Sequence, residues 1–249
     1  MEVKEKETES NFVFSNSVIS GKWIGYTIIM TSVSFGNVSQ LTTDLLLEHL
    51  DIVLLGFIID DAVLPVTGPQ PFSDDSHKLC ASLEVFECRE HSLIIVQQRA
   101  PFIKGRITAF CKKLFSWIDK SCFSKVVMYA GLSSHIRNDC DLQRDSFRFL
   151  TTDLELKKKM VDGLCWEEYS HKKTDGSITL PGSGIIKLVY EECNKRLLQF
   201  TALLVYCIPG YEFDDVILLL SRLQILLDMK FAIKSKPPSW NNYANENIF

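Results

Sequence analysis

The residue types of a hydrolytic triad occur close together at one place in the chain. In the stretch GLSSH, residues 131–135, Ser133 and Ser134 are followed by His135, and Asp139 comes shortly after. A serine at a nucleophile elbow needs the pattern G-x-S-x-G, because glycines on both sides permit the strained turn. The second glycine is absent here, and a histidine adjacent to a serine in sequence is poorly placed to act as its base. The segment therefore predicts loop hydrogen bonding and not a catalytic serine.

Two glycine-containing turns have the residue types of an anion site. LPGSGI, residues 180–185, precedes a predicted helix, where backbone amides attract phosphate or carboxylate. SFGN, residues 34–37, also precedes a helix, with Gly36 as a permissive residue and Asn37 as a candidate N-cap. Neither has the spacing of a phosphate-binding or dinucleotide-binding loop. Two interpretations stay open: a phosphorylase- or hydrolase-like enzyme that binds an anion at LPGSG, or a scaffold whose glycines make tight connections.

Metal and cofactor sites are not indicated. The eight cysteines include no C-x-x-C pair and no histidine at zinc-ligand spacing. Several cysteines lie in apolar segments, where a free thiol behaves as a small hydrophobe. Reduced cysteines are typical of a protein of the cytoplasm or nucleus. No group of residues supplies a nucleophile, a base and an orienting partner. The sequence therefore predicts no catalytic residues, no metal and no cofactor.

The composition excludes several classes of protein. The net charge is −4, and the longest basic run is Lys157-Lys158-Lys159, so a nucleic-acid partner is not expected. The apolar runs IVLLGFII and ALLVYCI are too short to cross a bilayer. The start, MEVKEKETES, alternates charges where a secretory leader would need an apolar core. We expect a soluble protein of the cytoplasm and nucleus, with no membrane partner.

The candidate site residues are positioned by strands that alternate with helices. The patterns predict strands over 23–34, 52–60, 125–130 and 199–208, helices over 38–50, 101–118, 153–162, 185–197 and 213–229, and an antiparallel hairpin around residues 89–91. The run 52–60 is continuously apolar, as expected for a strand covered on both faces. The prediction is a single α/β/α sandwich domain with a largely parallel sheet. Its boundaries are 22–230, after a flexible leader of residues 1–21 and before an extended tail of residues 231–249.

The last predicted helix, residues 213–229, is apolar almost all round. Such a helix is buried on two sides, either within the domain or beneath a partner subunit. The second alternative makes this helix the candidate dimer interface. The residues assigned to that interface are Val216, Leu219, Leu223 and Leu226.

Seven stretches, in order along the chain, resemble the proteasome assembly chaperone 2 family. They are SFGNVSQLTTDLLL, VLPVTGPQPF, FIKGRITAFCKKLFSWI, IRNDCDLQRDSFRFL, LCWEE, LPGSGIIKLVYEEC and PPSW. The resemblance runs from about Tyr26 to Trp240. It implies a fold like that of nucleoside phosphorylases and a role that is not enzymatic. It further implies a heterodimer with proteasome assembly chaperone 1, which binds the α-subunit ring of the 20S proteasome, promotes ring formation and prevents off-pathway α-ring dimers.

The resemblance also implies a use for the tail. Members of the family insert C-terminal residues into pockets between α subunits, usually as a hydrophobic residue, then Tyr or Phe, then any residue. This chain closes with Asn247-Ile248-Phe249, so its aromatic residue stands last. The candidate ring-binding residues are Trp240, Tyr243, Ile248 and Phe249. A tail with no docking role is the alternative.

Overall fold

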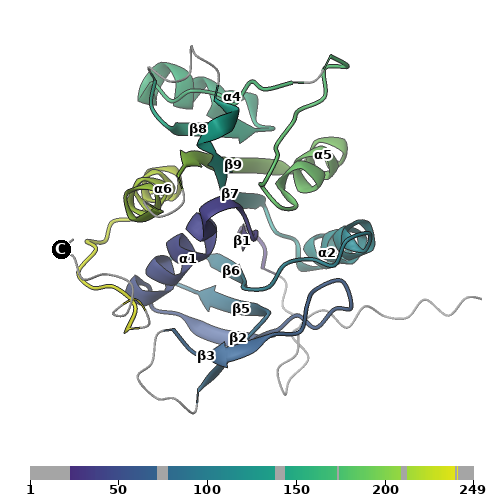
Figure 1. Ribbon diagram of the computed structural model, residues 1–249, viewed down its shortest axis with the longest axis vertical. Helices are drawn as coiled ribbons and strands as arrows, with labels where there is room; N and C mark the ends of the chain where they lie inside the picture. Colours follow the sequence, from purple (N-terminus) through teal and green to yellow (C-terminus); the bar gives the residue numbers. More distant parts are fainter. Residues whose placement is uncertain are drawn as a thin grey trace, which may run out of the picture.

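The computed structural model describes residues 23–71, 78–137, 144–172, 174–208, 212–238 and 240. Within them a seven-stranded sheet stands between two layers of helices (Figure 1). Across the sheet the strands lie in the order β2 (Val53–Phe57), β5 (Leu83–Cys88), β6 (Leu93–Gln98), β1 (Thr27–Thr31), β7 (Lys125–Ser133), β9 (Gln199–Cys207) and β8 (Phe147–Thr151). A separate two-stranded sheet joins β3 (Thr67–Pro69) to β4 (Leu79–Ala81).

The helices divide between the two faces of the sheet. α1 (Val38–His49) and α6 (Glu212–Leu227) cover one face, and α2 (Ile107–Ser121) and α5 (Ile186–Arg196) cover the other (Figure 1). α4 (Leu154–Lys158) continues into a π-helical turn, Lys159–Gly163, near β8. Two short 3-10 turns, Phe35–Asn37 and Ser134–Ile136, follow β1 and β7. The predicted α/β/α sandwich is confirmed.

The sheet is largely parallel. Strands β6, β1, β7 and β9 run in one direction, whereas β5 and β8 pair antiparallel to their neighbours. The predicted hairpin is β5–β6, in which Leu83 pairs with Gln98 and Cys88 with Leu93. The hairpin prediction is therefore confirmed.

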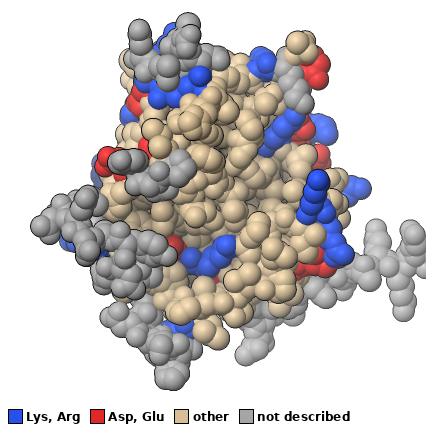
Figure 2. All heavy atoms as spheres, in the orientation of Figure 1, with Lys and Arg blue, Asp and Glu red and all other residues tan. Residues whose placement is uncertain are grey.

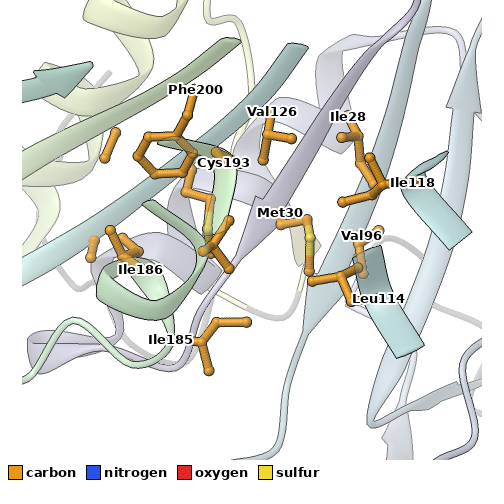
Figure 3. Packing of buried hydrophobic residues seen from close by; sticks show 14 of the residues in the cluster. Ile28, Met30, Val96, Leu114, Ile118, Val126, Ile185, Ile186, Cys193 and Phe200 are labelled. Carbon is orange, nitrogen blue, oxygen red and sulfur yellow. The ribbon is translucent and has the colours of Figure 1, made fainter. Parts of the chain in front are cut away.

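The core forms two layers because successive side chains of a strand point to opposite faces. On β1, Ile28 and Met30 face α2 and α5, whereas Ile29 faces α1 and α6. In Figure 3, Met30 lies toward Leu114 of α2, and Phe200 of β9 lies toward α5. All five side chains are at most 1% exposed. Each fully buried side chain of this size contributes roughly 1.5–3 kcal/mol to folding, so the alternation in the strands stabilises both layers.

Two predictions about local structure were wrong. The run 52–60 does not form a strand covered on both faces: β2 is the edge strand, and Val53 and Leu54 are 51% and 41% exposed. The helix predicted from Pro101 begins at Ile107 instead. Phe102 forms a bridge with Val63, and this tertiary pairing keeps the chain extended where the apolar pattern alone favours a helix.

Candidate functional site

The carboxyl ends of β1, β6 and β7 form the place where an α/β sheet of this kind would hold a ligand. The chain leaves β1 for α1 on one face of the sheet and leaves β6 for α2 on the other face. Neighbouring strands whose connections diverge in this way leave a crevice at their carboxyl ends. Both glycine turns of the sequence lie beside this crevice, which makes it the first candidate for a site.

The turn after β1 packs tightly against β7. A Cβ atom at Gly131 of β7 would collide with the carbonyl oxygen of Phe35. The backbone amide of Gly131 donates a hydrogen bond to Oγ of Ser34 at 3.1 Å. Gly36 and Asn37 both have positive φ angles, 69° and 54°. Asn37 occupies the N-cap position of α1, as predicted, but its side chain makes no capping hydrogen bond. Hydrogen bonds of Ser39, to the carbonyl oxygen of Ser32 and the hydroxyl of Ser34, hold this turn together instead.

The turn at residues 180–185 packs against the same loop. A Cβ atom at Gly184 would collide with Oγ of Ser32, and that hydroxyl accepts a hydrogen bond from the amide of Ile185 at 3.1 Å. The carbonyl oxygen of Gly182 accepts a hydrogen bond from the amide of Phe35 at 3.1 Å. The amide of Ile185 at the start of α5 is therefore satisfied from within the chain. Both turns fit each other, and this supports the scaffold interpretation over an anion site.

The serine-histidine stretch does not form a triad. Oγ of Ser133 accepts a hydrogen bond from the backbone amide of His135 at 3.4 Å, which closes a local turn. In the described part of the chain no hydrogen bond joins either serine hydroxyl to the imidazole ring, and Asp139 lies outside that part. The expectation of loop hydrogen bonding is confirmed for Ser133.

A buried ionic cluster occupies the crevice. Arg99, just after β6, donates to Asp44 of α1 at 2.9 Å and to Glu84 of β5 at 3.1 Å. Gln97 donates to Asp44 at 2.8 Å and accepts a hydrogen bond from the hydroxyl of Thr31 at 2.9 Å. These side chains come from α1, β1, β5 and β6, so the cluster connects the helix layer to the hairpin.

Burial controls the electrostatics of this cluster. Removal from water raises the pKa of the Asp44 and Glu84 carboxyls, and the Arg99 guanidinium acts in the opposite direction. Side-chain exposure is only 8% for Asp44 and 1% for Glu84. Oε1 of Glu84 has no hydrogen-bond partner among the described residues. The arrangement is structural, since every contact it makes joins elements of the fold.

Sequence reasoning missed this cluster. The one available signal is Asp44, which interrupts the apolar face of the amphipathic helix in the motif LTTDLLL. An acid at such a position needs a buried partner. Its partner is 55 residues away in sequence, so no local pattern identifies Arg99.

The residues predicted for the dimer interface lie on α6 toward the sheet. Val216, Leu219 and Leu223 are fully buried in the chain's own core, and Leu226 is partly buried at its margin. A single chain does not test the interface, which stays a prediction. Burial nevertheless leaves only Leu226 of this set near the surface.

The described part of the tail lies against the domain. Phe231 stacks on His49 of α1, and the amide of Lys234 donates to Nε2 of the same histidine at 3.0 Å. Trp240 is 7% exposed and packs edge-on against Phe213 of α6, with ring centroids 5.9 Å apart. Trp240 is therefore a core contact in this structure. Tyr243, Ile248 and Phe249 lie outside the described residues.

Other kinds of site are not supported by the described ranges. They contain no cluster of three or more His, Cys, Asp or Glu side chains that could hold a metal ion. None of their helices combines the length and apolarity needed to cross a bilayer. The face seen in Figure 2 has a wide uncharged area over its middle, with both basic and acidic side chains scattered around it. Such a face suits contact with protein better than contact with phosphate.

Comparison with known proteins gives the family. The model of the PAC2 family matches residues 28–235. The chain belongs to the PAC2 family. Proteasome assembly chaperone 2 of Nematostella vectensis is 33% identical over 220 residues, which cover 82% of this chain and 90% of the relative. Proteasome assembly chaperone 2 of Homo sapiens is 30% identical over 225 residues, which cover 86% of this chain and 85% of the relative. The resemblance noted in the seven motifs is confirmed.

Solved structures with the PAC2-family fold agree. PbaA of Pyrococcus furiosus, an archaeal homologue of proteasome-assembly chaperone, superimposes with a TM-score of 0.64 at 16% identity, and the match covers 84% of each chain. PbaB of the same organism, an archaeal proteasome activator, gives a TM-score of 0.60 at 15% identity, with 89% of each chain covered. At such identities the likeness concerns the fold alone.

The glycine packing gives a first prediction. Gly131→Ala places a methyl group against the Phe35 carbonyl, so we expect a loss of about 2 kcal/mol or more in the free energy of unfolding, measured by urea denaturation. Gly163→Ala is the control, because a Cβ there meets nothing within 4 Å. We expect the control to change stability by less than about 0.5 kcal/mol. Equal stability of both variants would contradict the packing account.

The buried cluster gives a second prediction. Arg99→Met leaves Asp44 and Glu84 buried without their cation. We expect the free energy of unfolding, measured by urea denaturation near pH 8, to fall by about 3–5 kcal/mol. Arg106→Met is the control, because its pair with Asp61 is 52% and 70% exposed. We expect the control to cost less than about 1 kcal/mol.

The pH dependence of the Arg99→Met variant has a definite sign. Without Arg99, burial raises the folded-state pKa of both carboxyls further above the unfolded values near 4. A group with a raised folded pKa contributes stability at low pH and loses it as the pH rises through that pKa. The difference in free energy of unfolding between the parent and the Arg99→Met variant should therefore become smaller as the pH is lowered from 8 to 5. A difference that is constant with pH would show that the two acids are not the cause.

Proposed function

We propose that this chain is a proteasome assembly chaperone that acts through protein surfaces as a heterodimer with proteasome assembly chaperone 1. The heterodimer binds the α-subunit ring of the 20S proteasome, promotes ring formation and prevents off-pathway α-ring dimers. The observation that carries the proposal is the similarity to proteasome assembly chaperone 2 over most of both chains. We place this activity in the cytoplasm and nucleus.

The geometry of the crevice favours a role without catalysis. Its turns are packed on each other, and Ser32 uses the amide that an anion at LPGSG would need. The competing proposal is a phosphorylase- or hydrolase-like enzyme. A thermal-shift measurement with inorganic phosphate and with nucleosides at millimolar concentration separates the two. We expect no change in Tm, whereas a rise of several degrees would favour the enzyme.

The tail is the proposed contact with the ring. Tyr243, Ile248 and Phe249 supply apolar side chains that fit a pocket between α subunits, and a terminal carboxylate can pair with a lysine there. Trp240 has a different part in this proposal. Because it packs on Phe213, it fixes the place from which the following residues continue.

Truncation of the tail tests this proposal. The chain is co-expressed with proteasome assembly chaperone 1 and α subunits of the same organism, with and without Ile248 and Phe249. We expect the intact chain to bring down both partners and the truncated chain to retain only the sister chaperone, as read by mass spectrometry. A length-matched control replaces both residues with serine and should behave as the truncation does.

The possible outcomes are distinct. Retention of α subunits by the truncated and serine variants would contradict the tail contact alone. Absence of both partners from the intact chain would contradict the chaperone proposal.

A further inference from the structure

The two edge strands of the sheet, β8 and β2, differ in whether another segment of chain pairs with their outer side. At the β8 edge, a segment of chain closes the strand: the amide of Phe149 donates to the carbonyl of Glu167 at 3.0 Å, and the amide of Tyr169 donates to the carbonyl of Phe149 at 2.8 Å. At the opposite edge, β2 pairs with β5 on its inner side, and none of the described residues pairs with its outer side (Figure 1). An open edge presents unpaired backbone N–H and C=O groups, which can pair with another strand.

The open edge extends beyond β2. Residues 79–81 of β4 and 83–88 of β5 form one nearly continuous length of chain. β2 pairs antiparallel with its later part and β3 pairs antiparallel with its earlier part. In pairing order Phe57 faces Glu84, and Thr67 faces Ala81. β2 and β3 therefore lie one after the other along the β4–β5 length of chain and together form an interrupted edge.

Exposed apolar side chains are concentrated along this edge. Val53 and Leu54, on successive positions of β2, point to opposite faces and are 51% and 41% exposed. Other large apolar side chains that are exposed in the same part of the chain are Ile59, Leu64, Val66 and Leu79. A long, exposed and apolar edge promotes aggregation unless another strand covers it.

β2 and β3 themselves carry no basic residue. No Lys or Arg occurs between Trp23 and His77. Native edges are commonly protected by lysine, and β2 lacks this protection. Asp51 before β2 and Glu90 beyond β5 are exposed, and both stand near Cys88. Neither makes an ion pair with another described residue, whereas Arg89 beside Glu90 is paired with Glu87 at 3.0 Å. Two unpaired acids therefore stand at the start of the edge.

A second copy of the chain fits this edge poorly. An antiparallel pairing of β2 with β2, centred on Leu55, would bring Asp51 opposite Ile59, so the acid would face an apolar side chain. Since no Lys or Arg occurs between Trp23 and His77, the β2 segment of a second copy offers no cation to pair with Asp51. The β2–β5 ladder also has a register shift between Leu54 and Gly56, and such bulges twist an edge away from its own copy.

We propose that the β2–β3 edge is the surface that receives proteasome assembly chaperone 1, which adds an extended strand whose flanking residues are lysine or arginine. This inference rests on the proposed function and deepens it by naming the face and the chemistry of the partner. Main-chain hydrogen bonds extend the sheet, alternate apolar side chains cover Val53 and Leu54, and basic flanks meet Asp51 and Glu90.

The test replaces exposed side chains of the edge and measures the heterodimer. Val53→Lys/Leu54→Lys is compared with Ile225→Lys on α6, whose native side chain has nearly the same exposure, 49%. Binding to purified proteasome assembly chaperone 1 is followed by interferometry, and folding by Tm. We expect at least about 30-fold weaker binding for the double variant, which corresponds to about 2 kcal/mol. We expect less than about threefold change for Ile225→Lys, and a Tm within a few degrees of the parent for both.

Two further measurements test the mode of pairing. Hydrogen exchange of the complex should protect amides of residues 53–57 that exchange freely in the isolated chain. The variant Asp51→Lys/Glu90→Lys should slow association about tenfold at low salt. Unchanged exchange at β2, or unchanged association of the charge-reversed variant, would overturn strand addition or the basic flanks respectively.

The outcomes separate this inference from the proposed function. If the parent and the Val53→Lys/Leu54→Lys variant bind the sister chaperone equally, the inference fails and the chaperone function stands. If Ile225→Lys alone weakens binding, the interface lies on α6 instead. Failure of the parent to bind would overturn both proposals. A parent that dimerises with itself, and that the double variant makes monomeric, would show that the occupant is a second copy.

Discussion

The close approach of the loop after β1 to β7 is the constraint on which the centre of this structure depends. The Phe35 carbonyl lies where a Cβ of Gly131 would be, and Ser32 lies where a Cβ of Gly184 would be. Glycine is required at both places because no other residue lacks a Cβ atom. The same contacts connect the loop to the start of α5, so α1 and α5 are set against the sheet from opposite faces by one stretch of backbone.

This constraint decides how the carboxyl edge can be used. In many α/β proteins the corresponding crevice is open and binds a ligand. Here backbone fills one part, and the cluster of Asp44, Glu84 and Arg99 fills the next. A fold whose ligand crevice is closed can still act through its outer surfaces. The open β2 edge and the uncharged area of the face seen in Figure 2 are such surfaces.

The sequence predicts the fold well where local pattern decides it. The runs SLEVFEC and SLIIVQQR, the Arg89-Glu90-His91 turn between them and the spacing of Leu residues in α1 identify their elements correctly. The run at 52–60 shows the limit: a buried central strand and an apolar edge strand have the same composition, and only the order of the strands distinguishes them. The segment around Phe102 shows the same limit, because its pairing with the distant residue Val63 overrides the helical pattern.

The candidate sites were harder to predict for the same reason. The glycine turns stand out in the sequence, but what each glycine faces depends on residues more than 90 positions away, as with Phe35 and Gly131. Trp240 looks like part of an extended tail, and its contact with Phe213 appears only in the folded chain. Asp44 signals a buried partner without identifying it.

We propose that the molecule works as one half of a chaperone for α-ring assembly. Native mass spectrometry of recombinant α subunits, assembled with and without the purified heterodimer, tests this claim most directly. We expect single α rings that carry the heterodimer, and fewer α-ring dimers than in its absence. An unchanged population of α-ring dimers, with no chaperone bound to any ring, would contradict it.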